Sequence, residues 1–337
     1  MTASGFLAEI AGVGRDPKRG GYSRHAFDAP EHDLREWFVE RALGLGLDVE
    51  TDRNGNIWAW WGPPGRNAVV TGSHLDSVPG GGAFDGPLGV VSGLSAVEAL
   101  QTNGFRPRRP LAVVVFAEEE GGRFGVPCLG SRLLTGTIDA DKARGLRDAD
   151  GVTFAEAAGK AGVDPARMGR DTERLDRIGQ FLELHVEQGR GLIDLGAPVA
   201  VGSTVIAHGR WRFSFAGQGN HAGATLLADR ADPMLPAAAT VTAVRRLAAQ
   251  VPDARATVGR LVPTPGGTNV IASTVDLWLD ARVPGQGTPG LVAEISRAAS
   301  EAAQEEGCRV EVTRESYSGD VVFDDALRRD LGGWLGG

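Results

Sequence analysis

The strongest constraint on the fold of this chain is a pattern that recurs in its first two hundred residues. Short apolar runs end in, or carry, acidic and imidazole side chains. Three such runs occur: Asn67–Ser73 before His74 and Asp76, Leu111–Ala117 before Glu118, Glu119 and Glu120, and Phe181–Val186 with His185. Apolar runs of this length predict buried strands. The pattern therefore predicts a sheet whose strand ends gather groups that can bind metal or move protons.

The segment between the first two runs predicts how their strands are connected. A glycine-rich loop covers Pro79–Gly89, and the run Val90–Leu100 has helical character that ends near Gly104. An earlier stretch, Glu31–Leu45, has apolar residues at helical spacing. Strand, loop, helix and strand in this order form a crossover unit. We therefore expect an α/β fold with a parallel or mixed sheet covered by helices.

The second half of the chain predicts a smaller α+β unit. Its expected elements are strands around 211–215, 256–262, 274–282 and 309–314 and helices over 231–250 and 289–306. With 337 residues the chain is too long for one small core, which favours two domains. We assign residues 1–208 and 318–337 to a catalytic domain, and residues 209–317 to an inserted domain.

Composition excludes several classes of protein. The net charge of −8 argues against a nucleic-acid-binding surface, which needs clustered Lys and Arg. The two cysteines, Cys128 and Cys308, lack the spacing of a disulfide framework or a thiolate zinc site. No apolar run approaches the ~20 residues of a membrane-spanning helix, and the N-terminal residues lack a secretory signal. We expect a cytoplasmic protein that acts on a small molecule.

The strand ends offer a plausible division of chemical roles. Asp76 lies two residues after His74 and could orient its imidazole. Asp85 lies on the glycine-rich loop, where the backbone can approach a metal closely. Three successive glutamates repel one another unless a cation neutralises them, and one could then act as a base. Nitrogen and oxygen ligands without thiolates suit zinc or manganese, and a bridging carboxylate would suit two ions.

Each of these motifs alone has an ordinary structural explanation. A lone His-x-Asp is more often a satisfied pair in a core or on a surface, and a run of glutamates is usually a solvated helix end. The same arrangement at three separate strands is what favours a functional site.

Four segments together resemble one family. They are Gly-Ser-His-Leu-Asp-Ser-Val from Gly72, Gly-Gly-Ala-Phe-Asp-Gly-Pro-Leu-Gly-Val from Gly81, Glu-Glu-Glu-Gly-Gly-Arg-Phe from Glu118, and Leu-His-Val-Glu-Gln-Gly from Leu184. They are similar to those of the di-metal aminoacylase-like amidohydrolases, in the branch with allantoate amidohydrolase, N-carbamoyl-L-amino-acid hydrolase and β-ureidopropionase. The resemblance extends from about Gly12 to Arg282.

The resemblance implies a role for each residue of the site. It implies one or two divalent ions per subunit, with His74 and His185 as terminal ligands, Asp85 as the bridge and Glu120 on the second ion. Glu119 would be the general base, and Asp76 would orient His74. In the inserted domain, which looks like the family's dimerisation or lid domain, His221 would stabilise the transition state. Gln188, Asn269 and Arg282 would join His221 in binding the substrate, often across the interface of a homodimer.

The sequence departs from the family pattern in two places. Ile271 is followed by Ala-Ser-Thr rather than the Pro-Gly that is frequent in this loop. The family continues into a Gly-His-Asp segment whose His completes the second metal site, whereas no His follows His221 here. The resemblance therefore predicts a C-terminally truncated member with an incomplete second site.

The resemblance favours hydrolysis of the ureido C–N bond of allantoate, with release of ammonia and CO2 in purine catabolism. The alternative substrate is an N-carbamoyl-L-amino acid or a β-ureido acid, since each carries a carboxylate and a carbamoyl group. Dipeptidase or aminoacylase activity is more distant. An alternative of another class is an inactive, metal-binding dimeric relic, favoured by the missing His and opposed by the retention of every other site residue.

Overall fold

The computed structural model describes residues 1–335 and consists of two compact units. We call Met1–Gly191 the N-terminal unit and Leu192–Gly337 the C-terminal unit. The contacts thus divide the chain at Gly191, while the assignment of residues 1–208 and 318–337 to one domain and 209–317 to another stays a prediction.

A five-stranded mixed sheet forms the centre of the N-terminal unit. Its strand order is β1-β2-β4-β3-β5. The strands are β1 (Asp48–Thr51), β2 (Ile57–Trp61), β3 (Ala68–His74), β4 (Leu111–Phe116) and β5 (Ile178–Leu182). β3 is parallel to both β4 and β5, whereas β2 is antiparallel to β1 and β4. The predicted mixed sheet and the crossover unit from β3 through helix α3 to β4 are therefore confirmed.

Helices enclose this sheet and bury its apolar side chains. The helices of this unit are α1 (Ala3–Ile10), α2 (Ala29–Gly44), α3 (Pro87–Thr102), α4 (Leu129–Thr135), α5 (Ala140–Arg144), α6 (Phe154–Lys160), η1 (Pro165–Arg167) and α7 (Thr172–Leu175). Helix α8 (Gly191–Leu195) begins at the last residue of the unit and continues into the C-terminal unit. Helices α1, α2 and α3 share one core with the sheet, in which Phe38, Leu94 and Val113 are fully buried. A second core holds Trp58 and Trp60, and much of the sheet is thus protected from water.

Two boundaries differ from those expected from the sequence. Helix α3 begins at Pro87 rather than Val90, because proline fits the first position of a helix, where no backbone N–H partner is needed. The predicted strand Phe181–Val186 is wrong, since β5 covers Ile178–Leu182 and His185 lies on the loop that follows. β5 is an edge strand with Phe181 39% exposed, so the apolar pattern there did not mark a buried strand.

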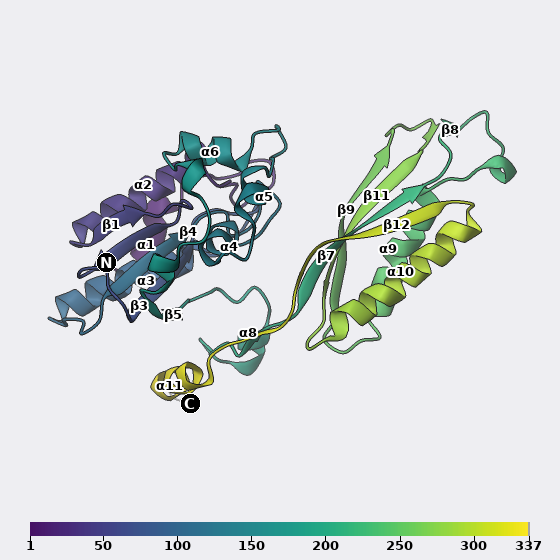
Figure 1. The fold of residues 1–337 in the computed structure, drawn as a ribbon. Helices are drawn as coiled ribbons and strands as arrows, with labels where there is room; N and C mark the ends of the chain where they lie inside the picture. Colours follow the sequence, from purple (N-terminus) through teal and green to yellow (C-terminus); the bar gives the residue numbers. More distant parts are fainter. Residues whose placement is uncertain (336–337) are drawn as a thin grey trace. The chain divides into compact units, whose positions relative to one another are not determined.

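The C-terminal unit is built on a four-stranded antiparallel sheet of order β12-β7-β11-β9. Its strands are β6 (Thr204–Val205), β7 (His208–Ala216), β8 (Asn220–His221), β9 (Arg255–Thr264), β10 (Val270–Ile271), β11 (Thr274–Arg282), β12 (Arg309–Ser318) and β13 (Val321–Val322). Its helices are η2 (Leu227–Asp229), α9 (Met234–Ala248), α10 (Gly287–Glu305) and α11 (Asp325–Leu335). Helices α9 and α10 lie along one face of the sheet and bury Phe213, Phe215 and Leu277 (Figure 1). The predicted α+β unit is confirmed.

Among residues 1–335, none of the helices combines the length and the apolar character that crossing a membrane requires.

Gly72 allows the two central strands to pair closely. Its φ is +143°, and a Cβ atom there would lie 1.9 Å from the carbonyl oxygen of Val114 on β4. We expect Gly72→Ala to lower the free energy of unfolding by about 3 kcal/mol, because the clash is with backbone that cannot turn away. Gly259→Ala is the matched control, since Gly259 also lies in a strand but has open space around its Cβ position. Urea unfolding of both variants tests this, and an unchanged midpoint for Gly72→Ala would contradict it.

Candidate metal and catalytic site

The parallel register of β3 and β4 brings two of the predicted segments to one edge of the sheet. His74 is the last residue of β3 and lies opposite Phe116, the last residue of β4. The glutamate turn 118–120 follows β4 after a single residue. A chain reversal there uses left-handed backbone at Glu118, with φ +50°, and at Gly121, with φ +66°. The imidazole and the glutamates therefore meet at the carboxyl end of these strands, as expected for an α/β sheet.

His74 is buried and in contact with carboxylates on both ring nitrogens. Its Nε2 lies 3.4 Å from Oε2 of Glu119, and its Nδ1 lies 2.9 Å from the carbonyl oxygen of Asp76 and 3.6 Å from Oδ1 of Asp76. A carbonyl oxygen only accepts, so Nδ1 donates and Nε2 is the nitrogen available to a ligand. Burial alone would lower the pKa of His74, but the negative charges of Asp76 and Glu119 outweigh burial, so the pKa is raised.

Asp76 fixes the glutamate turn as well as the imidazole. Its two carboxylate oxygens accept the backbone N–H groups of Glu119 and Glu120, each at 3.1 Å. Burial raises the pKa of Asp76 to about 6, and His74 and these N–H donors oppose that rise. Asp76 thus holds Glu119 and Glu120 through its carboxylate and His74 through its backbone carbonyl oxygen. Its orienting role in catalysis stays a prediction.

Glu118 differs from the two glutamates that follow it. Its side chain is fully buried, and its Oε1 accepts the backbone N–H groups of Arg123 and Phe124. Burial, reinforced by the nearby Asp76, raises the pKa of Glu118 to about 8. Glu118 therefore supports the turn from inside, while Glu119 and Glu120 are the two that can reach a ligand.

The second imidazole contacts the loop carboxylate. Nε2 of His185 lies 3.3 Å from Oδ1 of Asp85, and Nδ1 of His185 lies 2.7 Å from the carbonyl oxygen of Val186. The contact with Asp85 raises the pKa of His185 to about 9 and lowers that of Asp85. Gln188 donates to the other oxygen of Asp85 at 2.8 Å. His185 and Asp85, two of the predicted metal ligands, thus lie in contact, and Gln188, which was predicted to bind substrate, contacts Asp85.

Glu120 connects these two groups of residues. Its carboxylate lies close enough to His74 and Asp85 for the charges of both to act on it. Burial raises the pKa of Glu120 to about 7, and the neighbouring carboxylates of Asp85 and Glu119 add to that rise. The four predicted ligands therefore lie in one electrostatically coupled patch of the N-terminal unit.

The chemistry of this donor set fits a divalent cation. It offers two imidazole nitrogens and several carboxylate oxygens, with no thiolate, which is the ligand chemistry of zinc or manganese sites. Crowded carboxylates with a raised pKa are the situation that a cation relieves. As the side chains lie across residues 1–335, no three or more His, Cys, Asp or Glu are arranged to hold a metal ion. His74 and His185 each contact a carboxylate directly instead.

Sequence reasoning missed two residues that contact the site. Sγ of Cys128 lies 3.1 Å from Oε1 of Glu119, and burial raises the pKa of this thiol to about 12, so that it stays a protonated donor. Glu183 accepts a hydrogen bond at 2.5 Å from Ser73, the residue that precedes His74 in the chain. Neither residue belongs to a local motif, and only the folded arrangement brings Cys128 to the predicted base.

The predicted substrate-binding residues of the C-terminal unit form two separate groups. β8 pairs with β10, and the N–H of Ala222 donates to the carbonyl oxygen of Asn269, so His221 and Asn269 are neighbours. Arg282 ends strand β11, whose other end, Thr274, follows β10. Eight steps of a strand span about 26 Å. Arg282 donates from Nε to Asp280 at 2.9 Å, and this contact raises its pKa. Within this unit Arg282 is therefore not brought to His221 and Asn269.

The role of Asp76 in holding the glutamate turn can be measured as stability. We expect Asp76→Ala to lower the free energy of unfolding by about 3 kcal/mol, because it leaves the N–H groups of Glu119 and Glu120 without their acceptor. Asp76→Asn keeps one acceptor oxygen and should cost about half as much. Urea unfolding at pH 7 compares the two, and equal stability of Asp76→Ala and the unmodified protein would show that the turn does not depend on this carboxylate.

Comparison with known proteins identifies relatives of this chain. The chain is 39% identical over 279 residues to an N-carbamoyl-L-amino acid amidohydrolase of Geobacillus stearothermophilus, which covers 82% of this chain and 68% of that protein. It is 38% identical over 255 residues to a ureidoglycolate hydrolase of Arabidopsis thaliana, covering 73% of this chain and 54% of that protein. It is 31% identical over 286 residues to the allantoate amidohydrolase of Escherichia coli, covering 82% and 67%.

A solved structure has the same fold. An amidase of the hydantoinase/carbamoylase family from Burkholderia vietnamiensis superposes with a TM-score of 0.89 at 28% identity, over 99% of this chain and 81% of that one. The sequence pattern of peptidase family M20/M25/M40 matches residues 70–332, which include every candidate site residue. The resemblance expected from the motifs is therefore confirmed, and the chain belongs to peptidase family M20/M25/M40, a family of hydrolases.

Proposed function

We propose that this protein is a divalent-metal-dependent amidohydrolase that cleaves the carbamoyl C–N bond of a small ureido acid. The observation that carries the proposal is the coupled patch of His74, Asp85, Glu120 and His185 beside Glu119. Relatives named as amidohydrolases of carbamoyl and ureido compounds support the same chemistry. Because the chain spans only part of each of these relatives, the activity of the whole protein is part of the proposal.

Two substrates are the leading candidates. Allantoate is the substrate first expected from the family resemblance, and an allantoate amidohydrolase is 31% identical to this chain, but the motifs do not separate the two substrates. An N-carbamoyl-L-amino acid is favoured by a closer relative, at 39% identity. Both molecules combine a carboxylate with a carbamoyl group, so the same constellation would serve either, and selectivity would come from the remaining pocket contacts. We place N-carbamoyl-L-amino acids first and allantoate second.

The metal would be held by His74, Asp85, Glu120 and His185. A divalent cation in such a site polarises the carbonyl group and lowers the pKa of water. The protein's own contribution is to fix the donors: the carbonyl oxygen of Asp76 holds Nδ1 of His74, the carbonyl oxygen of Val186 holds Nδ1 of His185, and Gln188 holds Asp85. Support of this kind sets the orientation of metal ligands.

Glu119 is the proposed general base. It would accept a proton from the attacking water as the new C–O bond forms. It would then deliver this proton to the leaving nitrogen as the C–N bond breaks. The carbamate product then yields ammonia and CO2. Its carboxylate is positioned from two sides, since Asp76 accepts the N–H of Glu119 and the Cys128 thiol donates to its Oε1. A fixed carboxylate loses little reorganisation free energy in the reaction.

Recognition of the substrate is assigned to Gln188, His221, Asn269 and Arg282. The Arg282 fork can bind a carboxylate through two N–H groups, and His221 can donate to the developing oxyanion. About 26 Å of strand separates Arg282 from the end where His221 and Asn269 lie, which is longer than a small ureido acid. We therefore propose a homodimer in which one site combines Arg282 of one copy with His221 and Asn269 of the other.

The hydrolase proposal predicts the behaviour of a Glu119→Gln variant. Glutamine keeps the shape but cannot accept a proton, so we expect turnover to fall by a factor of about 10² to 10⁴ while bound zinc or manganese is retained. Ammonia release from N-carbamoyl-L-amino acids, allantoate and ureidoglycolate, with and without added metal, measures this. Metal content is determined on the same samples. A folded, metal-loaded protein with no turnover on this panel would favour the inactive relic.

The proposed composite site predicts complementation between two variants. Arg282→Ala and His221→Ala should each be inactive alone. After mixing and subunit exchange, half of the dimers contain one copy of each variant, and one of their two sites has both side chains intact. We therefore expect about a quarter of the unmodified activity to return. A mixture as inactive as its components, despite exchange verified by mass spectrometry, would show that the three residues do not combine across two copies.

A further inference from the structure

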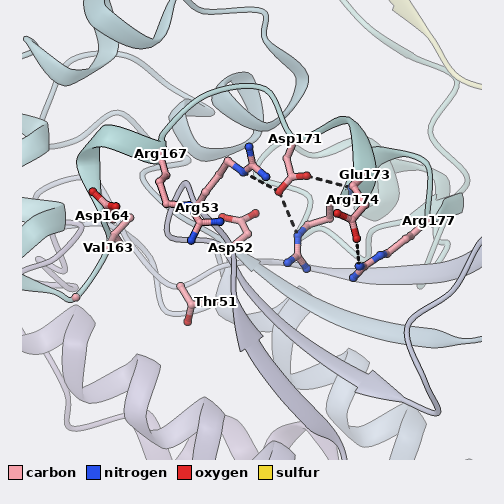
Figure 2. Close-up of a pocket in the computed structure, with 11 residues that line it drawn as sticks. Thr51, Asp52, Arg53, Val163, Asp164, Arg167, Asp171, Glu173, Arg174 and Arg177 are labelled. Carbon is pink, nitrogen blue, oxygen red and sulfur yellow. Dashed lines mark hydrogen bonds and ion pairs between the residues drawn. The ribbon is translucent and has the colours of Figure 1, made fainter.

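A second polar pocket lies in the N-terminal unit, apart from the candidate metal site. It has a volume of about 350 Å³ and none of its lining residues belongs to the metal and catalytic set. The end of strand β1 and the segment from Gly162 to Arg177 form its walls. Figure 2 shows its lining, which includes four arginines: Arg53, Arg167, Arg174 and Arg177. Four carboxylates line the pocket as well, so what it can bind depends on which of these charged groups already have partners. They belong to Asp52, Asp164, Asp171 and Glu173.

The acidic residues of the pocket are already engaged by the protein. Both oxygens of Asp52 are occupied, since they accept hydrogen bonds from the backbone N–H groups of Asn54 and Asn56 and from the side chains of Asn56 and Trp58. Burial raises the pKa of Asp52, which weakens its negative charge further. Oδ1 of Asp164 accepts the backbone N–H of Ala166, and Oδ1 of Asp171 accepts that of Arg174. Glu173 pairs with Arg177 at 2.6 Å. Few oxygen atoms of these carboxylates are therefore left to accept a hydrogen bond from a ligand.

Arg174 and Arg177 both pair with Glu50, whereas the other two arginines keep unused donors. Arg167 is exposed at the pocket, and its side chain makes no hydrogen bond or ion pair with any of residues 1–335. Arg53 contacts Asp171 through Nε alone, at 3.1 Å, which leaves its two terminal nitrogens. Nε of Arg174 is buried without a hydrogen bond, and its nearest acidic oxygen, on Asp171, is 3.9 Å away. Figure 2 shows Asp171 between Arg53 and Arg174, with their contacts drawn as dashed lines.

We propose that this arginine pocket binds a small molecule through an oxyanion group, either phosphate or carboxylate. Guanidinium groups bind both through paired N–H donors, and partial burial strengthens such contacts. The side chain of Arg167 and the two terminal nitrogens of Arg53 are the donors that an anion in the pocket would meet. The site is independent of the hydrolase reaction, because it uses none of the residues assigned to catalysis or metal binding.

The experiment measures anion binding by isothermal titration calorimetry on the full, metal-loaded chain. Inorganic phosphate and malonate are titrated separately at constant ionic strength, with sodium chloride as the reference. We expect saturable binding of at least one of them. The stronger of the two identifies the group that the pocket takes.

Two variants separate this pocket from other anion sites. Arg167→Gln should weaken binding about tenfold, since it removes one charge-assisted contact. Arg167 is exposed and has no partner, so the variant should fold normally, which thermal unfolding checks. Arg170→Gln is the matched control, because Arg170 is exposed and only three residues away but does not line the pocket. An anion held only at the metal site would bind Arg167→Gln and the unmodified chain equally. Three results would overturn the proposal. They are unchanged binding by Arg167→Gln, equal weakening by Arg167→Gln and Arg170→Gln, and no binding of either anion.

Discussion

Parallel hydrogen bonding between β3 and β4 is the constraint on which the candidate site depends. It aligns His74 with Phe116, so the segment after each strand emerges at the same edge of the sheet. The pairing is tight enough that only glycine fits at position 72, against the backbone of Val114. β5 adds its own carboxyl end on the other side of β3, and the loop after it delivers His185. The order β4-β3-β5 thus gathers ligands that are more than a hundred residues apart in the chain.

The carboxylate of Asp76 turns this edge into a defined site. A sheet edge with three glutamates in succession would otherwise hold mutually repelling side chains. Asp76 accepts the N–H groups of Glu119 and Glu120 while its carbonyl oxygen holds His74, so orientation is set by a residue that itself need not touch the ligand. Glu118 turns inward to the N–H groups of Arg123 and Phe124. Three adjacent glutamates thereby acquire different environments.

The sequence was most informative where hydrophobic pattern and chemistry coincide. β3, α3 and β4 could be predicted because an apolar run, a glycine-rich loop and a helical run follow one another in the order of a crossover unit. The C-terminal unit could be predicted from the alternation of Trp211, Phe213 and Phe215 and from its long Ala-rich helices. The predicted end of β5 was wrong, because the extent of an edge strand depends on its hydrogen bonds to the neighbouring strand rather than on burial. Cys128 and the arginine pocket escaped prediction because their partners are distant in the chain and no local spacing marks them.

His74, Asp85, Glu120 and His185 are the side chains that we propose hold a divalent cation beside Glu119. The most direct measurement is X-ray diffraction from crystals of the zinc- or manganese-loaded protein, with data collected above and below the absorption edge of the metal. Our account predicts an anomalous peak between these four side chains, with His74 bound through Nε2. A well-ordered site at which the imidazoles still contact the carboxylates directly, with no anomalous peak at saturating metal, would contradict it.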